Sequence, residues 1–367
     1  MPEIVPLEWT GESLRFLDQT KLPQEQAVTV ARSYSDVVDA IRGMQVRGAP
    51  AVGISSAYAL VLAAKAVNTQ DMRRMFTYLS DVAKEVIKAR PTAANIQWAI
   101  QRMLKAANPS RSVQELRQRL ETEAVAIHRE DVATNRRIGE LGADLIPQNS
   151  TVLTHSNTGA LATAGYGTAL GVIRTAWEKG NKIRVLATET RPLLQGARLT
   201  AWELVQLGIP TDLIVDSAAG TLLSQGQVGC VIVGADRVAA NGDIVNKVGT
   251  YLLAVVAHEN NIPFHVAAPT STLDLSLASG DGIPLEDGDP EEVTRWGNST
   301  TTPKGVSVRN VVFDVTPHRY ISSIITERGI VTAPYDQGLA KLVETEHQTA
   351  GAVPATEEVG VNEEAVG

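Results

Sequence analysis

Beyond Pro147, short runs of β-forming residues alternate with longer stretches of helical spacing. Segments at 160–178, 197–207, 217–225 and 249–259 have the helical spacing, and the β runs are 151–154, 183–187, 212–215, 231–233, 264–267 and 311–314. This alternation is typical of a doubly wound, mostly parallel sheet, because parallel strands need long crossovers that are usually helices. The sequence therefore predicts a Rossmann-like α/β domain over residues 148–340.

The first 147 residues show a different pattern. Residues 1–30 mix short extended patterns with turn residues, which predicts a small β-hairpin or meander. Helical spacing then dominates, over 35–46, 54–67, 71–89, 95–107 and 113–145. The segment 54–67 is apolar on nearly all sides, so we expect a buried helix there. We predict a mainly helical amino-terminal domain over 1–147, with a small β start.

Two stretches lack a regular pattern. Residues 270–310 are rich in Thr, Asp, Gly and Pro, and loops of this length in compact domains are usually lids or binding loops. After residue 340 the chain has paired glutamates and little apolar content. We expect 341–367 to form an acidic, disordered tail.

Composition narrows the function classes. Of the 367 residues 44% are hydrophobic, and no apolar run is long enough to cross a bilayer. The amino terminus lacks the basic and apolar regions of a signal peptide, so the cytoplasm is the expected compartment. A net charge of −8, with no basic stripe, disfavours nucleic-acid binding. Local cations could still bind a phosphorylated small molecule.

Cysteine, histidine and glycine patterns argue against common cofactors. The single cysteine, Cys230, excludes an intramolecular disulfide, and its apolar strand pattern predicts a packed core thiol. The six histidines show no metal-ligand spacing, so we predict no metal. Gly165, Gly167 and Gly171 do not fit the dinucleotide fingerprint, which disfavours NAD.

The most informative candidate stretch is 230–250. Its apolar run ends at Asp236, and the carboxyl ends of buried strands are where open α/β sheets place their chemistry. Asn246 and Lys247 follow ten residues later, just before Gly249 opens a helix. One loop would thus hold an acid, an amide, a cation and a helix amino end, which together suit a small anionic substrate.

Two loops of the helical domain resemble a phosphate clamp. Arg47, Gly48 and Ala49 lead towards the buried helix, where free N–H groups and a bidentate arginine favour an anion. An ordinary helix connector explains this segment equally well. Arg90 precedes a proline and a helix start in the same way, although a surface arginine is the simpler interpretation of that loop alone.

Two strand-end loops add polar candidates. Thr154–Gly159 ends the first predicted strand of the α/β domain and contains Ser156 beside His155. A nucleophilic serine is disfavoured, because adjacent strand residues point to opposite faces and no G-x-S-x-G elbow is present. In the next loop, Gln195 could hydrogen-bond a sugar or a phosphate, or could belong to a helix cap.

Together these loops resemble the S-methyl-5-thioribose-1-phosphate isomerase family, which forms a superfamily with the regulatory subunits of initiation factor 2B and with ribose-1,5-bisphosphate isomerase. The resemblance covers about residues 5–335 and rests on RGAPAVG, ARPTAAN, THSNTG, TETRPLLQGARLTAWEL, GADRVAANGDIVNKVGT and FDVTPHRYISSIITERG. It implies an aldose–ketose isomerase of methionine salvage that acts by acid/base catalysis as a homodimer, without metal or nucleotide.

The resemblance also assigns roles to residues. It implies that Asp236 is the proton donor and that the substrate-contacting positions are Arg47, Gly48, Ala49, Arg90, Gln195, Asn246 and Lys247. One position departs from the family pattern, because isomerases of this family typically have T-H-C-N-x-G and this chain has Ser156 in place of the cysteine. A serine hydroxyl can donate a hydrogen bond, but it does not ionise near pH 7 as a thiol can.

Three interpretations of function remain at this stage. The first is isomerisation of 5-methylthioribose 1-phosphate, or of a related sugar such as 5-deoxyribose 1-phosphate or ribose 1,5-bisphosphate. The second is a non-catalytic regulatory protein of the initiation-factor 2B class. The third, and the least favoured, is a hydrolase that uses Ser156.

Overall fold

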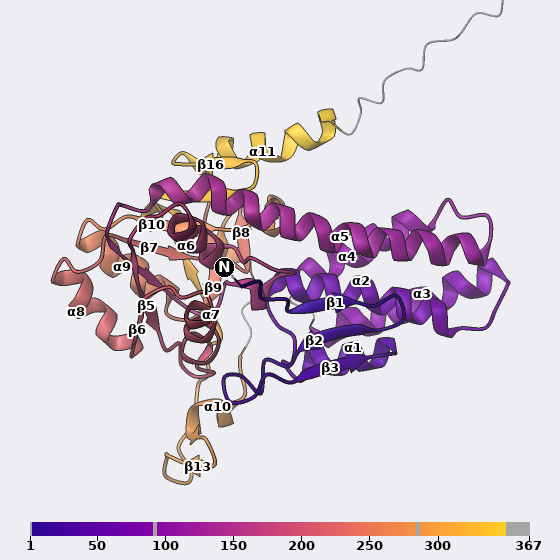
Figure 1. Cartoon of the computed structure of the whole chain (residues 1–367), viewed down its shortest axis with the longest axis horizontal. Helices are drawn as coiled ribbons and strands as arrows, with labels where there is room; N and C mark the ends of the chain where they lie inside the picture. Colours follow the sequence, from indigo (N-terminus) through magenta and orange to yellow (C-terminus); the bar gives the residue numbers. More distant parts are fainter. Residues whose placement is uncertain (1, 91–93, 284–286, 350–367) are drawn as a thin grey trace, which may run out of the picture.

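The computed structural model describes residues 2–90, 94–283 and 287–349. The amino-terminal helices form one side of the molecule and the α/β part forms the other (Figure 1). Helix α5 (Val113–Gly142) is long enough to pack against both, because it contacts α2 and α4 at one end and α6 and β15 at the other. The two parts therefore share one rigid element.

The amino-terminal part begins with three antiparallel strands, β1 (Leu7–Trp9), β2 (Leu14–Leu17) and β3 (Val28–Ala31), which confirms the predicted meander. Helices α1 (Tyr34–Arg42), α3 (Met72–Ala89) and α4 (Ala94–Ala107) pack with α5 around α2 (Ala49–Ala66). Among the described residues, α2 is the one helix long and apolar enough to cross a membrane, so the expectation that no apolar run has this length was wrong. Of this helix, 78% is buried, as in a core helix. It begins at Ala49, five residues before the predicted start.

The α/β part contains a seven-stranded sheet with the order β16-β15-β10-β7-β4-β5-β6. All neighbouring pairs are parallel except β15 with β16. The strands are β4 (Thr151–Thr154), β5 (Arg184–Thr188), β6 (Thr211–Ile214), β7 (Cys230–Val233), β10 (Phe264–Ala267), β15 (Ser323–Thr326) and β16 (Gly329–Val331). The predicted doubly wound fold is confirmed.

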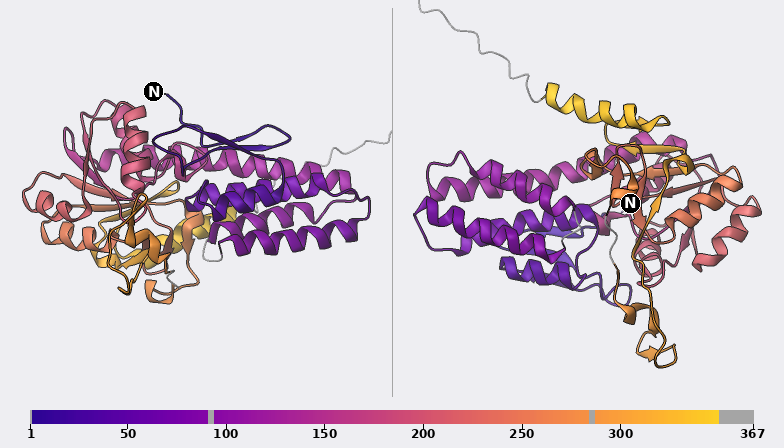
Figure 2. Two further views of the ribbon diagram at one scale, coloured as in Figure 1. Left: turned by 90° about the horizontal axis from the view of Figure 1, so that it is seen from below. Right: turned by 180° about the vertical axis from the view of Figure 1, so that it is seen from behind.

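Helices cover both faces of this sheet (Figure 2). Alternate strand residues point to opposite faces, so Cys230 and Ile232 pack with α6 (Ala169–Glu178) and α7 (Ala201–Gln206), whereas Val231 and Val233 pack on the other side. That second side is covered by α8 (Ala219–Ser224), α9 (Thr250–Glu259) and α11 (Tyr335–Thr349). Cys230 is fully buried and burial raises the pKa of its thiol to about 12, as expected of a core thiol.

Several local predictions were wrong. The segment 234–249 is not one loop, because β8 (Arg237–Ala239) and β9 (Ile244–Lys247) form a hairpin in a second sheet with β11 (Leu273–Asp274) and β14 (Phe313–Thr316). Residues 160–178 are not one helix either. A 3-10 turn at Ala160–Ala162 comes first, and α6 begins only at Ala169.

The carboxyl-terminal third also has more structure than expected. The stretch 270–310 contains α10 (Pro290–Thr294) and a small hairpin, β12 (Arg295–Trp296) with β13 (Ser299–Thr300). Helix α11 extends to Thr349, so the first nine residues of the predicted disordered tail are helical. Residues 350–367 lie outside the described residues.

Candidate active site

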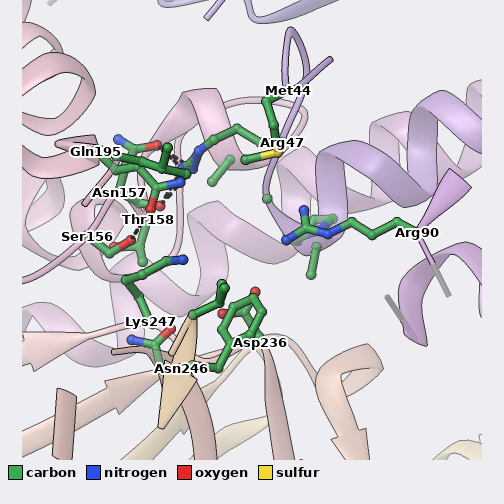
Figure 3. Close-up of a pocket in the computed structure, with 18 of the residues that line it drawn as sticks. Met44, Arg47, Arg90, Ser156, Asn157, Thr158, Gln195, Asp236, Asn246 and Lys247 are labelled. Atoms are coloured by element: carbon green, nitrogen blue, oxygen red, sulfur yellow. Dashed lines mark hydrogen bonds between the residues drawn. The ribbon is translucent and has the colours of Figure 1, made fainter. Parts of the chain in front are cut away.

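The structure brings the candidate residues into one cavity of about 260 Å³, between the helical part and the carboxyl ends of the parallel strands (Figure 3). Every residue proposed from the sequence lines it: Arg47, Gly48, Ala49, Arg90, Ser156, Gln195, Asp236, Asn246 and Lys247. Residues 91–93 of the second arginine motif lie outside the described residues. The sequence suggested each of these loops separately, and the structure shows that they line the same cavity.

Helix α2 begins at the cavity wall. Its N-cap is Gly48, with φ at 89°, and a Cβ there would lie 2.3 Å from the carbonyl oxygen of Ala162. Only glycine lets the start of the helix approach this turn so closely. Because Gly48 supplies no side-chain cap, the first backbone N–H groups of α2 remain available to a ligand.

Arg47 is buried beside this helix start. Its two terminal nitrogens donate to the side-chain and backbone oxygens of Asn157, with shortest distances of 2.6 and 2.8 Å. Its Nε is buried without a partner among the described residues. Burial lowers the pKa of Arg47 to about 10, and the charges of Asp236 and Glu203 act in the opposite direction. Arg47 therefore stays cationic at neutral pH, with one donor uncommitted.

The loop after β4 holds Ser156 in a left-handed conformation, with φ at 61°. Its backbone N–H donates to Thr190 Oγ1 at 2.9 Å, and its carbonyl oxygen accepts from Thr200 Oγ1 at 2.6 Å. Its hydroxyl donates to Gln195 Oε1 at 3.2 Å. The structure therefore places two of the predicted site residues, Ser156 and Gln195, in direct contact.

His155 does not activate this serine. Its ring nitrogens face Thr188 Oγ1 at 2.7 Å and the carbonyl oxygen of Val248 at 2.9 Å. Burial lowers the pKa of His155. Since the Ser156 hydroxyl is committed to an amide oxygen and not to an imidazole base, this geometry disfavours the hydrolase interpretation.

Asp236 follows β7, and its backbone N–H donates to Val245 on β9 at 2.9 Å. Lys247, at the end of β9, lies 4.7 Å from the ring centroid of Phe313. Burial lowers the pKa of Lys247 to about 8, while the charge of Asp236 partly opposes that shift. The side chains of Lys247 and Arg90 point into the same space from opposite sides, and the Asp236 carboxyl group lies beside it (Figure 3).

The amino end of α9 does not bind the substrate anion in the way that the sequence predicted. Asp314 accepts hydrogen bonds from the backbone N–H groups of Gly249 at 2.7 Å and Tyr251 at 3.1 Å. This helix end is therefore already capped by a carboxylate of the chain and is not open to a substrate anion. The Asn246 amide donates to Thr250 Oγ1 at 3.0 Å, which fixes its side chain at the same corner.

Sequence reasoning missed several polar residues at or near the cavity. Asn157 and Glu203 form a buried hydrogen bond of 2.8 Å behind Arg47. Both residues lie inside motifs that carry the family resemblance, and this position in the motifs could have identified them as candidate site residues. Asp287 and Glu292 line the cavity as well, so the irregular stretch 270–310 does contribute to it. Within the described residues, no cluster of three or more potential metal ligands occurs.

The fold and the cavity define a class of protein: a doubly wound α/β protein with a cavity lined by cationic side chains at the switch point of its sheet. The sequence profile of the initiation factor 2 subunit family matches residues 45–333. The chain therefore belongs to this family, and several curated relatives at about 50% identity are named methylthioribose-1-phosphate isomerase.

Two relatives illustrate how close the match is. The protein named methylthioribose-1-phosphate isomerase from Acetivibrio thermocellus is 52% identical over 338 residues, which cover 92% of this chain and 99% of the relative. The protein of the same name from Pelotomaculum thermopropionicum is 54% identical over 342 residues, which cover 92% of this chain and 94% of the relative. The match therefore includes both parts of the fold.

Solved structures give the same result. The 5-methylthioribose 1-phosphate isomerase of Pyrococcus horikoshii is 40% identical, with a TM-score of 0.87, and the match covers 94% of this chain and 96% of that one. A structure described as translation initiation factor eIF-2B, subunit delta, from A. fulgidus is 41% identical, with a TM-score of 0.83, and covers 93% of this chain and 99% of that one. Both names thus occur on the same fold at similar identity.

Proposed function

We propose that this chain interconverts 5-methylthioribose 1-phosphate and 5-methylthioribulose 1-phosphate, as an acid/base aldose–ketose isomerase of methionine salvage. The observation that carries the proposal is the convergence of three cationic side chains, Arg47, Arg90 and Lys247, on the cavity that also holds Asp236. A sugar phosphate needs such positive charge at one end and an acid/base at the other.

The phosphate fits the Arg47 side of the cavity. There the open start of α2 at Gly48 and Ala49 offers backbone donors, and the buried Nε of Arg47 has no partner among the described residues. Arg90 and Lys247 reach the same space from other elements. Gln195 and Asn246 supply amides for sugar hydroxyl groups.

The reaction requires a balanced movement of protons. The phosphate on C1 blocks ordinary opening to a free aldehyde, so the bond between C1 and the ring oxygen must break while that oxygen takes a proton. The hydrogen on C2 then moves to C1, either with its electron pair or as a proton through a base. The C2 hydroxyl group loses its proton and becomes the carbonyl group, so no external oxidant or reductant is needed.

Asp236 suits this sequence, because one carboxyl group can give a proton to the ring oxygen and recover one from the C2 hydroxyl group. Ser156 suits the role of a neutral hydrogen-bond donor, because its hydroxyl does not ionise near pH 7. In the free protein this hydroxyl donates to Gln195, and it can turn to a substrate oxygen without any change of charge.

Assembly and location follow the family resemblance. We propose a homodimer in the cytoplasm that uses no metal or organic cofactor and binds neither nucleic acid nor membrane. The acid/base, the cations and the amides that the reaction needs are all side chains of this chain, which supports a reaction without a cofactor.

Two other functions have specific support. A related substrate, such as 5-deoxyribose 1-phosphate or ribose 1,5-bisphosphate, would use the same phosphate contacts. A non-catalytic regulatory role is favoured by the 41% identical structure described as an initiation factor subunit. Against it, a pure interaction module has no need of a buried arginine whose Nε lacks a partner among the described residues.

The test is turnover of the purified protein with each sugar phosphate, followed by NMR detection of the ketose. We expect 5-methylthioribose 1-phosphate to be the best substrate. Ketose from another sugar phosphate alone would reassign the substrate. No ketose from any of them at high enzyme concentration, together with co-purification of translation-factor subunits, would favour the regulatory role.

A further inference from the structure

Glu203 is a buried carboxylate beneath the loop that follows β4. It belongs to α7, and its residue is only 1% exposed. Its side chain accepts hydrogen bonds from Asn157 Nδ2 at 2.8 Å, from the Ala160 N–H at 2.7 Å and from the Leu161 N–H at 3.3 Å. Burial raises the pKa of Glu203, and these three hydrogen bonds oppose that shift because they favour the ionised carboxylate.

The loop is fitted closely around this carboxylate. A Cβ at Gly159 would lie 2.3 Å from Glu203 Oε2, so the carboxylate occupies the space that a side chain at residue 159 would need. Thr200, one turn before Glu203, donates to the carbonyl oxygen of Ser156 at 2.6 Å. The segment that leads into α7 therefore holds the whole loop from below.

Glu203 also decides which way the Asn157 amide points. A carboxylate can only accept, so the Asn157 NH₂ group must face Glu203 and its Oδ1 must face Arg47. The Arg47 guanidinium donates a hydrogen bond of 2.6 Å to that Oδ1. The reversed amide would set an acceptor against the carboxylate and a donor against the guanidinium, which loses hydrogen bonds on both sides.

The same chain of hydrogen bonds, from Arg47 through Asn157 to Glu203, which we call the relay, also affects the charge of Arg47. Every hydrogen bond that the described residues give Arg47 goes to neutral oxygens of Asn157. Glu203 lies directly behind that amide, and its negative charge raises the pKa of Arg47 against the effect of burial. The cation is thus stabilised without a carboxylate that would compete with a phosphate for its N–H groups.

We propose that Glu203 is a positioning residue for the anion site: through Asn157 it orients the Arg47 guanidinium and supplies its buried counter-charge, leaving the remaining N–H groups for a phosphate. The inference rests on the proposed function only in taking Arg47 as a phosphate contact. The simpler alternative is that Glu203 caps the turn at Ala160 and Leu161 and has no effect on Arg47.

A double-mutant cycle separates the two. We expect Glu203→Gln to weaken binding of inorganic phosphate, measured by calorimetry, by about tenfold, as one charge-assisted hydrogen bond would. In an Arg47→Ala background the same change should have less than a twofold effect, because the relay then has no target. Equal effects in both backgrounds would show that Glu203 acts only on the turn.

Asn157→Ala provides a second variant, because it removes the relay and leaves the contacts of Glu203 with Ala160 and Leu161. It should weaken phosphate binding to a similar extent, and unchanged binding would overturn the proposal even if Glu203→Gln does not fold. Asp131→Asn is the matched control, since this carboxylate accepts from the Ala164 N–H at 2.7 Å but makes no contact with Asn157. It should leave the phosphate affinity unchanged.

Phosphate binding can be measured without turnover, so the role of Glu203 and the proposed isomerase function are tested independently. If the parent protein binds phosphate but isomerises no sugar, the proposed function is wrong and the role of Glu203 can still be measured. If the parent is active, Glu203→Gln should raise KM about tenfold with a smaller change in kcat, because Arg47 holds the phosphate in both ground and transition states.

Discussion

Asp236 and Ser156 follow adjacent parallel strands, β7 and β4, at the point where the strand order of the sheet reverses. From β4 the chain proceeds outwards through β5 and β6, and it then returns to β7 on the other side of β4. The loops after two such strands diverge and leave a crevice between them. The acid and the hydroxyl group therefore face one cavity, although residues 156 and 236 lie far apart in the sequence.

Replacing Asp236 tests the acid directly. Asp236→Asn keeps the size of the side chain but cannot supply or recover a proton, so kcat should fall by at least about 100-fold. Binding of the sugar phosphate should stay within about threefold, because the cations hold the phosphate. Kinetics and calorimetry on one preparation measure both values.

Asp212→Asn is the control for that variant, because Asp212 is an exposed carboxylate on β6 that pairs with Arg184. It should leave both kcat and affinity unchanged. An Asp236→Asn protein with near-parental turnover would remove Asp236 from the mechanism.

Restoring the family cysteine tests residue 156. Ser156→Cys should raise kcat, by about tenfold or more if an ionisable group at this position takes part in proton transfer, with little change in KM. No gain would mean either that the serine is adapted to its own task or that the position is not catalytic here.

The thiol introduced by Ser156→Cys can be measured by chemical labelling without interference from another cysteine. Its single native cysteine, Cys230, is fully buried, so a thiol reagent should label only the introduced side chain. The pH dependence of labelling then gives the pKa of the new thiol. The parent protein should remain unlabelled in its native state.

The sequence was sufficient to predict the fold class and most of the residues that line the candidate cavity. Alternating β and helical periods specify a parallel sheet, and Asp236, Ser156 and Gln195 all follow its strands, so their convergence could be predicted from topology. Arg47 and Gly48 could be predicted because α2 is apolar and begins at a glycine and a proline.

The rest depended on contacts between distant segments. The β8–β9 hairpin was missed because its partner β14 lies about 70 residues further along, and strand propensity alone does not identify such pairing. Asp314 removes the amino end of α9 from the site through the same long-range pairing. Glu203 has the sequence context of an ordinary helical residue, and only the fold places it beneath Asn157.

The close approach of Gly48 to Ala162 can be tested by comparison with Gly11, a glycine that has nearly the same φ. Gly11 has φ at 90°, and a Cβ added there would have nothing within 4 Å, so Gly11→Ala should cost only the left-handed strain, about 1–2 kcal/mol of unfolding free energy. Gly48→Ala adds a clash with Ala162 and should cost about 1–3 kcal/mol more.

Urea unfolding measures both costs. Gly48→Ala should also weaken phosphate binding, because relief of the clash moves the start of α2 away from the cavity wall, whereas Gly11→Ala should not. Equal losses of stability in the two variants would mean that the start of α2 relaxes freely, and the cavity wall at Gly48 would then not be rigid.

Lys247 makes substrate affinity dependent on pH. Its pKa is lowered to about 8 by burial, so the side chain is a cation below pH 8 and loses its charge as the pH rises above that value. The phosphate is already a dianion above pH 7, since its second pKa is near 6. Affinity should therefore be constant near pH 7 and then fall above pH 8, by up to about tenfold per pH unit. Calorimetry between pH 7 and 9.5 measures this.

The Lys247→Gln variant identifies the titrating group. It should bind the sugar phosphate more weakly at pH 7 but show no further loss up to pH 9.5, because Arg47, with a pKa of about 10, stays largely charged over that range. A decline of the same size in parent and variant would assign the titration to another group. Because the charge of Asp236 is the main effect that opposes the lowering of the Lys247 pKa, Asp236→Asn should move the midpoint of the decline to lower pH.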